Sequence, residues 1–67
     1  MRKIRIGIFG PDGRMGKDLL NQIKNFEELE LSSLCEKKGH KSIGKKVSEV
    51  IVEDNVTNFI SKSDVIV

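Results

Sequence analysis

The fold of this chain is decided by residues 4–16, which read IRIGIFGPDGRMG. An apolar run comes first, glycines follow at positions 10, 13 and 16, and an amphipathic segment begins at Arg14. This pattern predicts a strand, a tight turn and a helix, in that order. The N-terminus of a helix presents unpaired backbone N–H groups and a positive dipole end, and glycines let a phosphate approach them closely. The stretch therefore predicts a cradle for a diphosphate.

Length and composition limit the chain to one small domain. Its 67 residues are 37% hydrophobic and 33% charged, an ordinary globular composition. The net charge of +2, without aromatic residues between basic ones, does not indicate a nucleic-acid partner. No apolar run approaches the ~18 residues of a membrane span. Because the single cysteine cannot form an internal disulfide and the first apolar run is too short for a signal peptide, we expect a cytoplasmic protein without a membrane partner.

Apolar periodicity predicts four strands and two helices. We expect strands over residues 2–9, 29–35, 50–52 and 64–67, one helix over residues 14–26, and a second helix capped by Asp54 or Asn55. The first strand is apolar on both faces, which suits the centre of a parallel sheet covered on both sides. We therefore predict an α/β fold, a Rossmann-like parallel sheet in the order 3-2-1-4 with flanking helices. It is expected to be truncated, since an apolar strand running into the C-terminus is typical of a sequence cut inside a larger domain.

The expected core follows from the same patterns. Residues 36–46 are polar and read as a loop, and we expect Ile43 and Val47 to anchor a short helical turn. The side chains expected to be buried lie on the helix stripes and on the first strand: Phe9, Met15, Leu19, Leu20, Ile23, Phe26, Val56, Phe59 and Ile60.

The glycines and one later carboxylate form a candidate dinucleotide site. Gly10, Gly13 and Gly16 depart from the commoner G-x-G-x-x-G spacing, but they sit between a strand and a helix. Glu36 follows the second strand, where a carboxylate can accept hydrogen bonds from both hydroxyls of an adenosine ribose. The alternative is that Gly10 and Gly13 only form a turn and that Gly16 only allows close packing.

The residues between these glycines modify the prediction. Pro11 has no N–H, so the remaining amides must hold the diphosphate. The Asp12 carboxylate would repel a diphosphate, and we expect it to turn outward or to bond a loop amide. Arg14 can reach a phosphate oxygen, although an exposed arginine without a ligand is an equally simple interpretation.

A basic loop follows Glu36. An acid there favours a free ribose 2′-hydroxyl, whereas the adjacent Lys37 can neutralise a 2′-phosphate, so both NADH and NADPH are candidate cofactors. The lysines at positions 41, 45 and 46 are interpreted as a solvated surface. His40 has no second ligand near it and is interpreted as a surface loop residue, not as part of a metal site. Cys35, without a resolving partner, is expected to be a small buried side chain.

Taken together, these motifs resemble those of the dihydrodipicolinate reductase family. The resemblance rests on residues 6–16, on Cys35-Glu36-Lys37 and on residues 63–67, which read SDVIV, and it spans nearly the whole chain. It implies reduction of 4-hydroxy-tetrahydrodipicolinate to tetrahydrodipicolinate by NADH or NADPH, in the diaminopimelate route to lysine. The residues it implies for cofactor binding are Gly10, Pro11, Asp12, Gly13, Arg14 and Met15 for the diphosphate, Glu36 for the ribose and Lys37 for a 2′-phosphate.

The same resemblance places the chemistry elsewhere. Members of the family carry a histidine pair, a catalytic lysine and a Gly-Thr-Thr-Gly stretch in a substrate domain through which they form homotetramers. Residues 1–67 are then the N-terminal part of a dinucleotide-binding domain, the substrate and tetramerisation domain is absent, and no catalytic residue is predicted here. Two alternatives stay open: a non-catalytic dinucleotide-sensing module, and the nucleotide half of another two-domain reductase such as a semialdehyde dehydrogenase.

Overall fold

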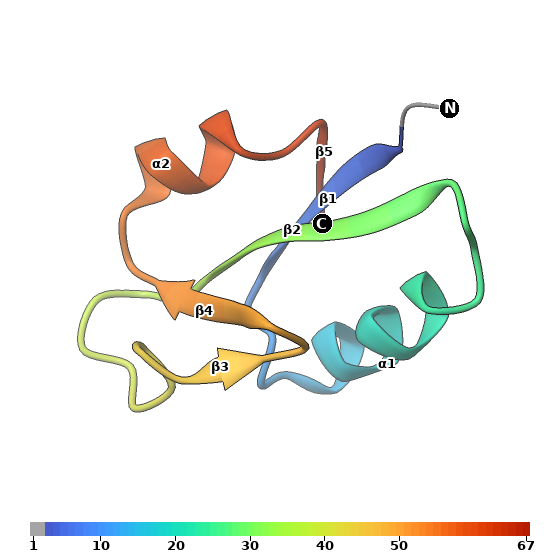
Figure 1. The fold of residues 1–67 in the computed structure, drawn as a ribbon. Coiled ribbons are helices and arrows are strands. Elements are labelled where there is room, and N and C mark those ends of the chain that lie inside the picture. The colour runs from blue at the N-terminus through green and yellow to red at the C-terminus, as the bar shows by residue number, and fades with distance from the viewer. Residues whose placement is uncertain (1–2) are drawn as a thin grey trace.

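The structure is a computed structural model that describes residues 3–67 (Figure 1). Its elements are β1 (Ile4–Phe9), α1 (Arg14–Ile23), β2 (Leu29–Cys35), β3 (Lys46–Val47), β4 (Val50–Glu53), α2 (Val56–Ser61) and β5 (Val65–Ile66). They form one sheet in the order β3-β4-β2-β1-β5. β1 pairs in parallel with β2 and β5, and β2 pairs in parallel with β4. The α/β class and the order of the four expected strands are confirmed. Arg2, which we included in the first strand, lies outside the described residues.

The two helices cover opposite faces of the sheet (Figure 1). α1 connects β1 to its neighbour β2, whereas α2 returns the chain from β4, past β2 and β1, to β5. Since the two connections run across the sheet in opposite directions and strand crossovers are right-handed, the helices must lie on opposite sides. On the face of α1, side chains at positions 19, 20 and 23 pack against a buried cluster of Ile6, Ile8, Leu34 and Val52. This cluster is the centre of the core.

The face of α2 is built around one aromatic side chain. Phe59 is 2% exposed, and its ring meets the edge of Phe9 with 6.2 Å between centroids and 65° between planes. A Cβ on Gly7 would collide with the Ser63 hydroxyl and would lie 2.9 Å from the Phe59 ring. The glycine in the middle of β1 therefore lets α2 approach the sheet closely. Asn55 caps this helix, as one of the two predicted candidates, by accepting a hydrogen bond from the Asn58 N–H (3.0 Å).

One strand was not predicted. β3 pairs antiparallel with β4, so the sheet is mixed and has five strands within the described residues. Val47, expected in a helical turn, is paired with Val50 across a two-residue connection. The connecting residues, Ser48 and Glu49, have φ of 48° and 70°, which is the left-handed conformation that a tight hairpin requires. The prediction was wrong here because neither residue is a glycine or asparagine, the usual sign of such a turn.

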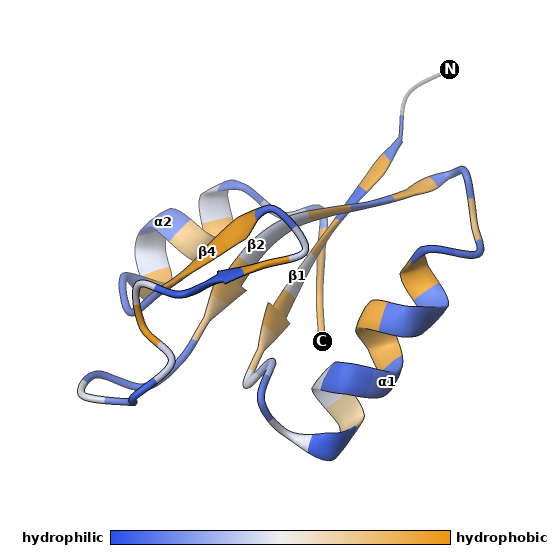
Figure 2. Cartoon of the chain, turned by 60° about the horizontal axis from the view of Figure 1, so that its bottom comes forward, coloured by the Kyte–Doolittle hydropathy of each residue, from blue (hydrophilic) through white to orange (hydrophobic). Residues whose placement is uncertain are grey.

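The expected extent of the first helix and several core assignments were also wrong. α1 ends at Ile23 instead of Phe26, and the Phe26 N–H bonds the Ile23 carbonyl three residues back in a tight turn (3.2 Å). Phe26 and Phe9 are about half exposed, Met15 is 71% exposed, and Val56 and Ile60 on α2 are exposed as well. An apolar stripe identifies the face that can be buried, but it does not show whether another element covers each position. Figure 2 shows the alternating hydrophobic and hydrophilic faces of α1.

A polar contact attaches the last strand. The Asp64 carboxylate accepts hydrogen bonds from the Arg5 backbone N–H (2.9 Å) and from its guanidinium (3.0 Å), and the Asp64 N–H donates to the Arg5 carbonyl (2.8 Å). The hydrogen bond to Asp64 raises the pKa of Arg5, which stays charged. These bonds fix the register of β5 beside β1. Neither helix within residues 3–67 has the length and hydrophobicity needed to cross a membrane.

Candidate dinucleotide site

The candidate site lies at the carboxyl ends of three parallel strands. Phe9 and Cys35 are register partners at the ends of β1 and β2, and the next N–H, that of Gly10, donates to the Cys35 carbonyl (2.9 Å). The Glu36 N–H donates to the carbonyl of Glu53 at the end of β4 (2.9 Å). These two bonds bring the glycine turn and the residues after β2 to one edge of the sheet. Ligands of open α/β sheets bind at this edge.

The glycine turn has the backbone that its sequence requires. Gly10 has φ of +80°, a backbone conformation that residues other than glycine rarely adopt. Its carbonyl accepts the N–H of Gly13 (3.1 Å), which closes the turn. Gly13 is the N-cap of α1, and no side chain caps that end of the helix. The first-turn amides of α1 are thus available to an anion.

Gly16 has a packing role. A Cβ at this position would lie 2.5 Å from the Gly10 carbonyl oxygen and 2.8 Å from the Pro11 Cα. Only glycine lets the first turn of α1 approach the glycine turn so closely. Gly16 therefore does allow close packing, as the alternative interpretation proposed. This role is compatible with a diphosphate cradle, because close packing sets the position of the helix N-terminus.

The other predicted residues of the turn lie at its surface or beneath it. Pro11 is buried, whereas Asp12, Arg14 and Met15 are exposed. The exposure of Asp12 agrees with a carboxylate that turns outward. Met15, which the periodicity assigned to the core, is instead exposed to solvent on the first turn of α1.

Glu36 is a buried carboxylate beside the glycine turn. It is 8% exposed, and its Oε2 is 3.8 Å from the place where a Cβ on Gly10 would be. A side chain at position 10 would therefore touch this carboxylate. Glu36 Oε1 accepts the N–H of Lys37 (3.2 Å), and Oε2 lies 3.7 Å from His40 Nε2. The predicted pairing of the turn with an acid after β2 is present in the geometry.

The basic residues after Glu36 have two different environments. Lys37, directly after Glu36, is exposed, and the lysines at positions 38, 41, 45 and 46 are exposed too. His40, interpreted as a surface loop residue, is instead half-buried and faces Glu36. That interpretation was wrong because Gly39, with φ of +88°, turns the loop back over the end of β2. The four-residue spacing from Glu36 was the only signal in the sequence.

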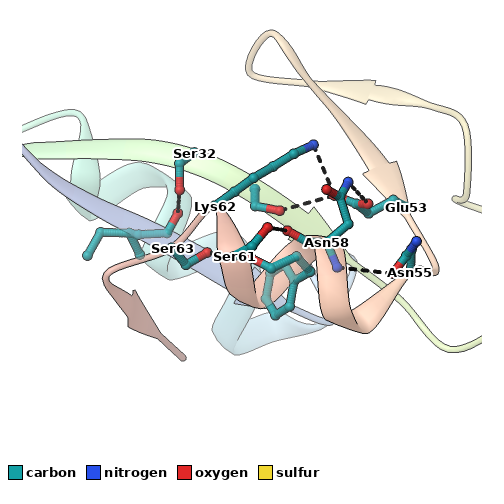
Figure 3. Close-up of polar contacts among 10 residues, drawn as sticks. Ser32, Glu53, Asn55, Asn58, Ser61, Lys62 and Ser63 are labelled. Atoms are coloured by element: carbon teal, nitrogen blue, oxygen red, sulfur yellow. Dashed lines mark hydrogen bonds and ion pairs between the residues drawn. The ribbon is translucent and has the colours of Figure 1, made fainter.

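A second carboxylate fixes the neighbouring strand end. Glu53 Oε1 accepts a hydrogen bond from Asn58 (2.7 Å), and Oε2 accepts one from Ser33 (3.2 Å) and lies 3.5 Å from Lys62 Nζ. Figure 3 shows Asn58 and Lys62 turned toward Glu53 from the side of α2. The Glu53 carbonyl accepts the Glu36 N–H, so this network also helps to fix the backbone position of Glu36. Among the described residues, no three His, Cys, Asp or Glu side chains are grouped as ligands for a metal ion.

Comparison with known proteins agrees with this geometry. Residues 4–67 match the family model described as "Dihydrodipicolinate reductase, N-terminus". The chain belongs to the dihydrodipicolinate reductase family. Relatives named 4-hydroxy-tetrahydrodipicolinate reductase include one from Pelagibacter ubique, 36% identical over the whole chain, and one from Nitrosospira multiformis, 31% identical over the whole chain. Another, from the Wolbachia of Drosophila simulans, is 30% identical over 97% of the chain.

The chain spans about a quarter of the length of these dihydrodipicolinate reductase relatives: 25%, 28% and 27%, respectively. The match covers β1 through β5, and so includes both the glycine turn and Glu36. The family resemblance that the sequence motifs indicated is confirmed. Among the alternatives considered, the match favours this reductase family over a semialdehyde dehydrogenase.

Proposed function

We propose that this chain binds NADH or NADPH as the nucleotide-binding part of a 4-hydroxy-tetrahydrodipicolinate reductase. The reaction is the reduction of 4-hydroxy-tetrahydrodipicolinate to tetrahydrodipicolinate, in the diaminopimelate route to lysine. The observation that carries the proposal is the buried Glu36 carboxylate beside Gly10, at the same sheet edge as the uncapped N-terminus of α1. An anion-binding helix end next to an acceptor for ribose hydroxyls suits a dinucleotide.

Each predicted residue has a place in this proposal. The first-turn amides of α1, with Gly10, Gly13 and the backbone at Met15, hold the diphosphate, while Pro11 and Asp12 shape the turn and the Arg14 guanidinium reaches a phosphate oxygen. Glu36 accepts the hydroxyls of the adenosine ribose. The exposed Lys37 neutralises a 2′-phosphate when the cofactor is NADPH. The nicotinamide, when bound, supplies the hydride.

The residues that act on the substrate are proposed to lie outside this chain. Residues 1–67 correspond to about a quarter of the relatives' length, and the one histidine of the site, His40, faces the carboxylate that we propose for the adenosine ribose. We therefore assign residues 1–67 to the N-terminal part of the dinucleotide-binding domain. The rest of the proposal is a cytoplasmic homotetramer assembled through a substrate domain. Light scattering on the full-length protein tests the assembly, and reduction of the substrate with each cofactor tests the reaction.

Replacing Glu36 tests the ribose assignment. In the full-length protein, Glu36→Ala should weaken NADH binding about tenfold to a hundredfold, because a charged acceptor for two hydroxyls is lost. NADPH binding should weaken less, since its 2′-phosphate gains nothing from a carboxylate. Titration calorimetry with both cofactors measures the two dissociation constants. Equal losses for NADH and NADPH would contradict the assignment, and Glu36→Gln, which keeps the shape of the side chain, controls for an effect of cavity formation.

Replacing Lys37 tests the phosphate assignment. Lys37→Ala should weaken NADPH binding about tenfold and leave NADH binding nearly unchanged, because only NADPH carries the charge that this lysine would meet. Lys45→Ala is the matched control, since it removes an exposed lysine from the same loop. An unchanged preference between NADH and NADPH in Lys37→Ala would contradict the phosphate assignment.

A further inference from the structure

The side chain of His40 lies between the candidate ribose acceptor and its own loop. Its Nε2 is 3.7 Å from Glu36 Oε2, an electrostatic contact slightly longer than a hydrogen bond. On the other side of the ring, Nδ1 accepts the Ser42 N–H (3.1 Å) and lies 2.8 Å from the Ser42 hydroxyl. The imidazole side chain is 22% exposed. The ring therefore bridges the loop backbone and the Glu36 carboxylate.

The backbone contact determines which ring nitrogen carries the proton. A peptide N–H can only donate, so the Nδ1 that faces the Ser42 N–H must be the unprotonated nitrogen of a neutral ring. The proton of the neutral imidazole is then on Nε2, which faces Glu36 Oε2. His40 thus presents an N–H donor toward the carboxylate.

The loop that carries His40 is fixed at both ends. The Glu36 N–H bonds the end of β4, and further along the Gly44 N–H donates to the Val52 carbonyl (2.8 Å) while the Val52 N–H donates to the Lys45 carbonyl (2.9 Å). Ser42, which holds the imidazole, is 2% exposed. The loop that carries the ring is thus hydrogen-bonded to the sheet, and the imidazole points toward Glu36 without a bound ligand.

We propose that His40 is a positioning residue that orients the Glu36 carboxylate for the adenosine ribose. To accept from two vicinal hydroxyls, the carboxylate must be rotated so that both oxygens face the ribose, and the adjacent backbone N–H holds only Oε1. The His40 Nε2–H lies 3.7 Å from the second oxygen, Oε2, on the side of Gly10, and attracts it electrostatically. The inference rests on the proposed binding of NADH or NADPH and adds a residue that sets its affinity.

Two substitutions separate this role from a purely structural one. His40→Gln keeps an N–H donor that reaches as far as Nε2, but it loses the acceptor at the δ position. His40→Asn keeps an acceptor at the δ position for the Ser42 N–H, but it has no group that reaches Glu36. In the full-length protein, His40→Asn should weaken NADH binding roughly threefold to tenfold, and His40→Gln should retain most of it. A structural role for the loop predicts the opposite order, which would overturn the inference.

A double-mutant cycle with Glu36 completes the test. Calorimetric titration with NADH is repeated for His40→Asn in a Glu36→Ala background, where the histidine has no carboxylate to orient. The effect of His40→Asn should disappear there, because the two residues act as a unit. The same loss in both backgrounds would overturn the inference but leave the proposed function intact. Failure of the unsubstituted protein to bind NADH or NADPH would overturn both.

Discussion

Cys35 is the residue at which the core meets the candidate site. Its side chain is fully buried at the end of β2, while its carbonyl accepts the Gly10 N–H that anchors the glycine turn. Burial raises the pKa of the Cys35 thiol above its ordinary value of 9.0, and the Glu53 carboxylate raises it further. A thiol in this environment stays protonated at neutral pH and behaves as a small apolar side chain.

The raised pKa of Cys35 has a consequence for stability. The folded state disfavours the thiolate, so the free energy of unfolding is unaffected by this group well below the thiol's ordinary pKa of 9.0. As pH rises through 9.0 toward the higher pKa of the folded state, the unfolded thiol loses its proton first and the free energy of unfolding falls. Urea unfolding of the full-length protein at pH 7.5 and about 9.5 should therefore show a larger loss of stability in the parent than in Cys35→Ala. The substitution removes only this thiol, so the difference between the two proteins isolates the contribution of Cys35. Identical pH dependence in the two proteins would contradict the expectation.

Residues of the site were predictable where strand topology alone brings them together. Gly10 and Glu36 follow neighbouring parallel strands, and the ends of such strands must meet at one edge. The position of His40 was not predictable, because it depends on the path of a loop that turns at Gly39, where φ is +88°. The sequence carries the glycine but not the direction in which the loop turns.

At the scale of elements, the β3–β4 hairpin is the least favourable local structure in the described chain. Its two-residue connection places Ser48 and Glu49 at positive φ, and no other non-glycine residue in the range 3–67 has that conformation. Each such residue costs on the order of 1 kcal/mol or more. The hairpin is compensated by partly buried Val47 and Val50, which pack against the core cluster. Tertiary contacts therefore hold a turn that local preference disfavours.

Relieving this strain should stabilise the protein. The double substitution Ser48→Asn with Glu49→Gly supplies the residues that two-residue hairpin turns prefer, so the free energy of unfolding should rise by about 1 kcal/mol. Urea denaturation of the full-length protein measures the change. Lys41→Gly is the control, since its φ is not positive and glycine there adds only flexibility. A double substitution that is neutral or destabilising would show that the turn is not strained.

Elements with a long apolar period were predictable, and the short paired strand was not. β1, β2 and α1 carry enough apolar positions to define their type from sequence, and for the observed strand order the right-handed crossover rule fixes the face that each helix covers. β3 has two residues, Lys46 and Val47, and exists only because β4 offers an edge to pair with. No pattern of two residues can indicate a strand.

For the whole molecule, the sheet is covered unevenly. α1 packs on the centre of one face, and Phe59 is the one buried residue that α2 contributes to the other. The strand order places β5 at one edge of the sheet, where Val65, Ile66 and the following Val67 are 44–47% exposed. In Figure 2 this segment, which runs to the label C, is hydrophobic. Sequence periodicity could identify these residues as apolar, but not whether another element covers them.

An uncovered apolar edge strand should make the 67-residue chain self-associate when it is studied alone. Unpaired N–H and C=O groups along β5 template pairing with another copy, and exposed side chains at positions 65–67 and Phe9 add apolar area. Size-exclusion chromatography with light scattering should show oligomers or aggregates, and a charge placed on the edge by Ile66→Lys should shift the chain toward monomer. Ile60→Lys, which charges an exposed apolar position on α2 instead, should have a smaller effect. A monomer with a sharp, reversible thermal transition would contradict this expectation, because it would mean that the exposed edge strand does not promote association.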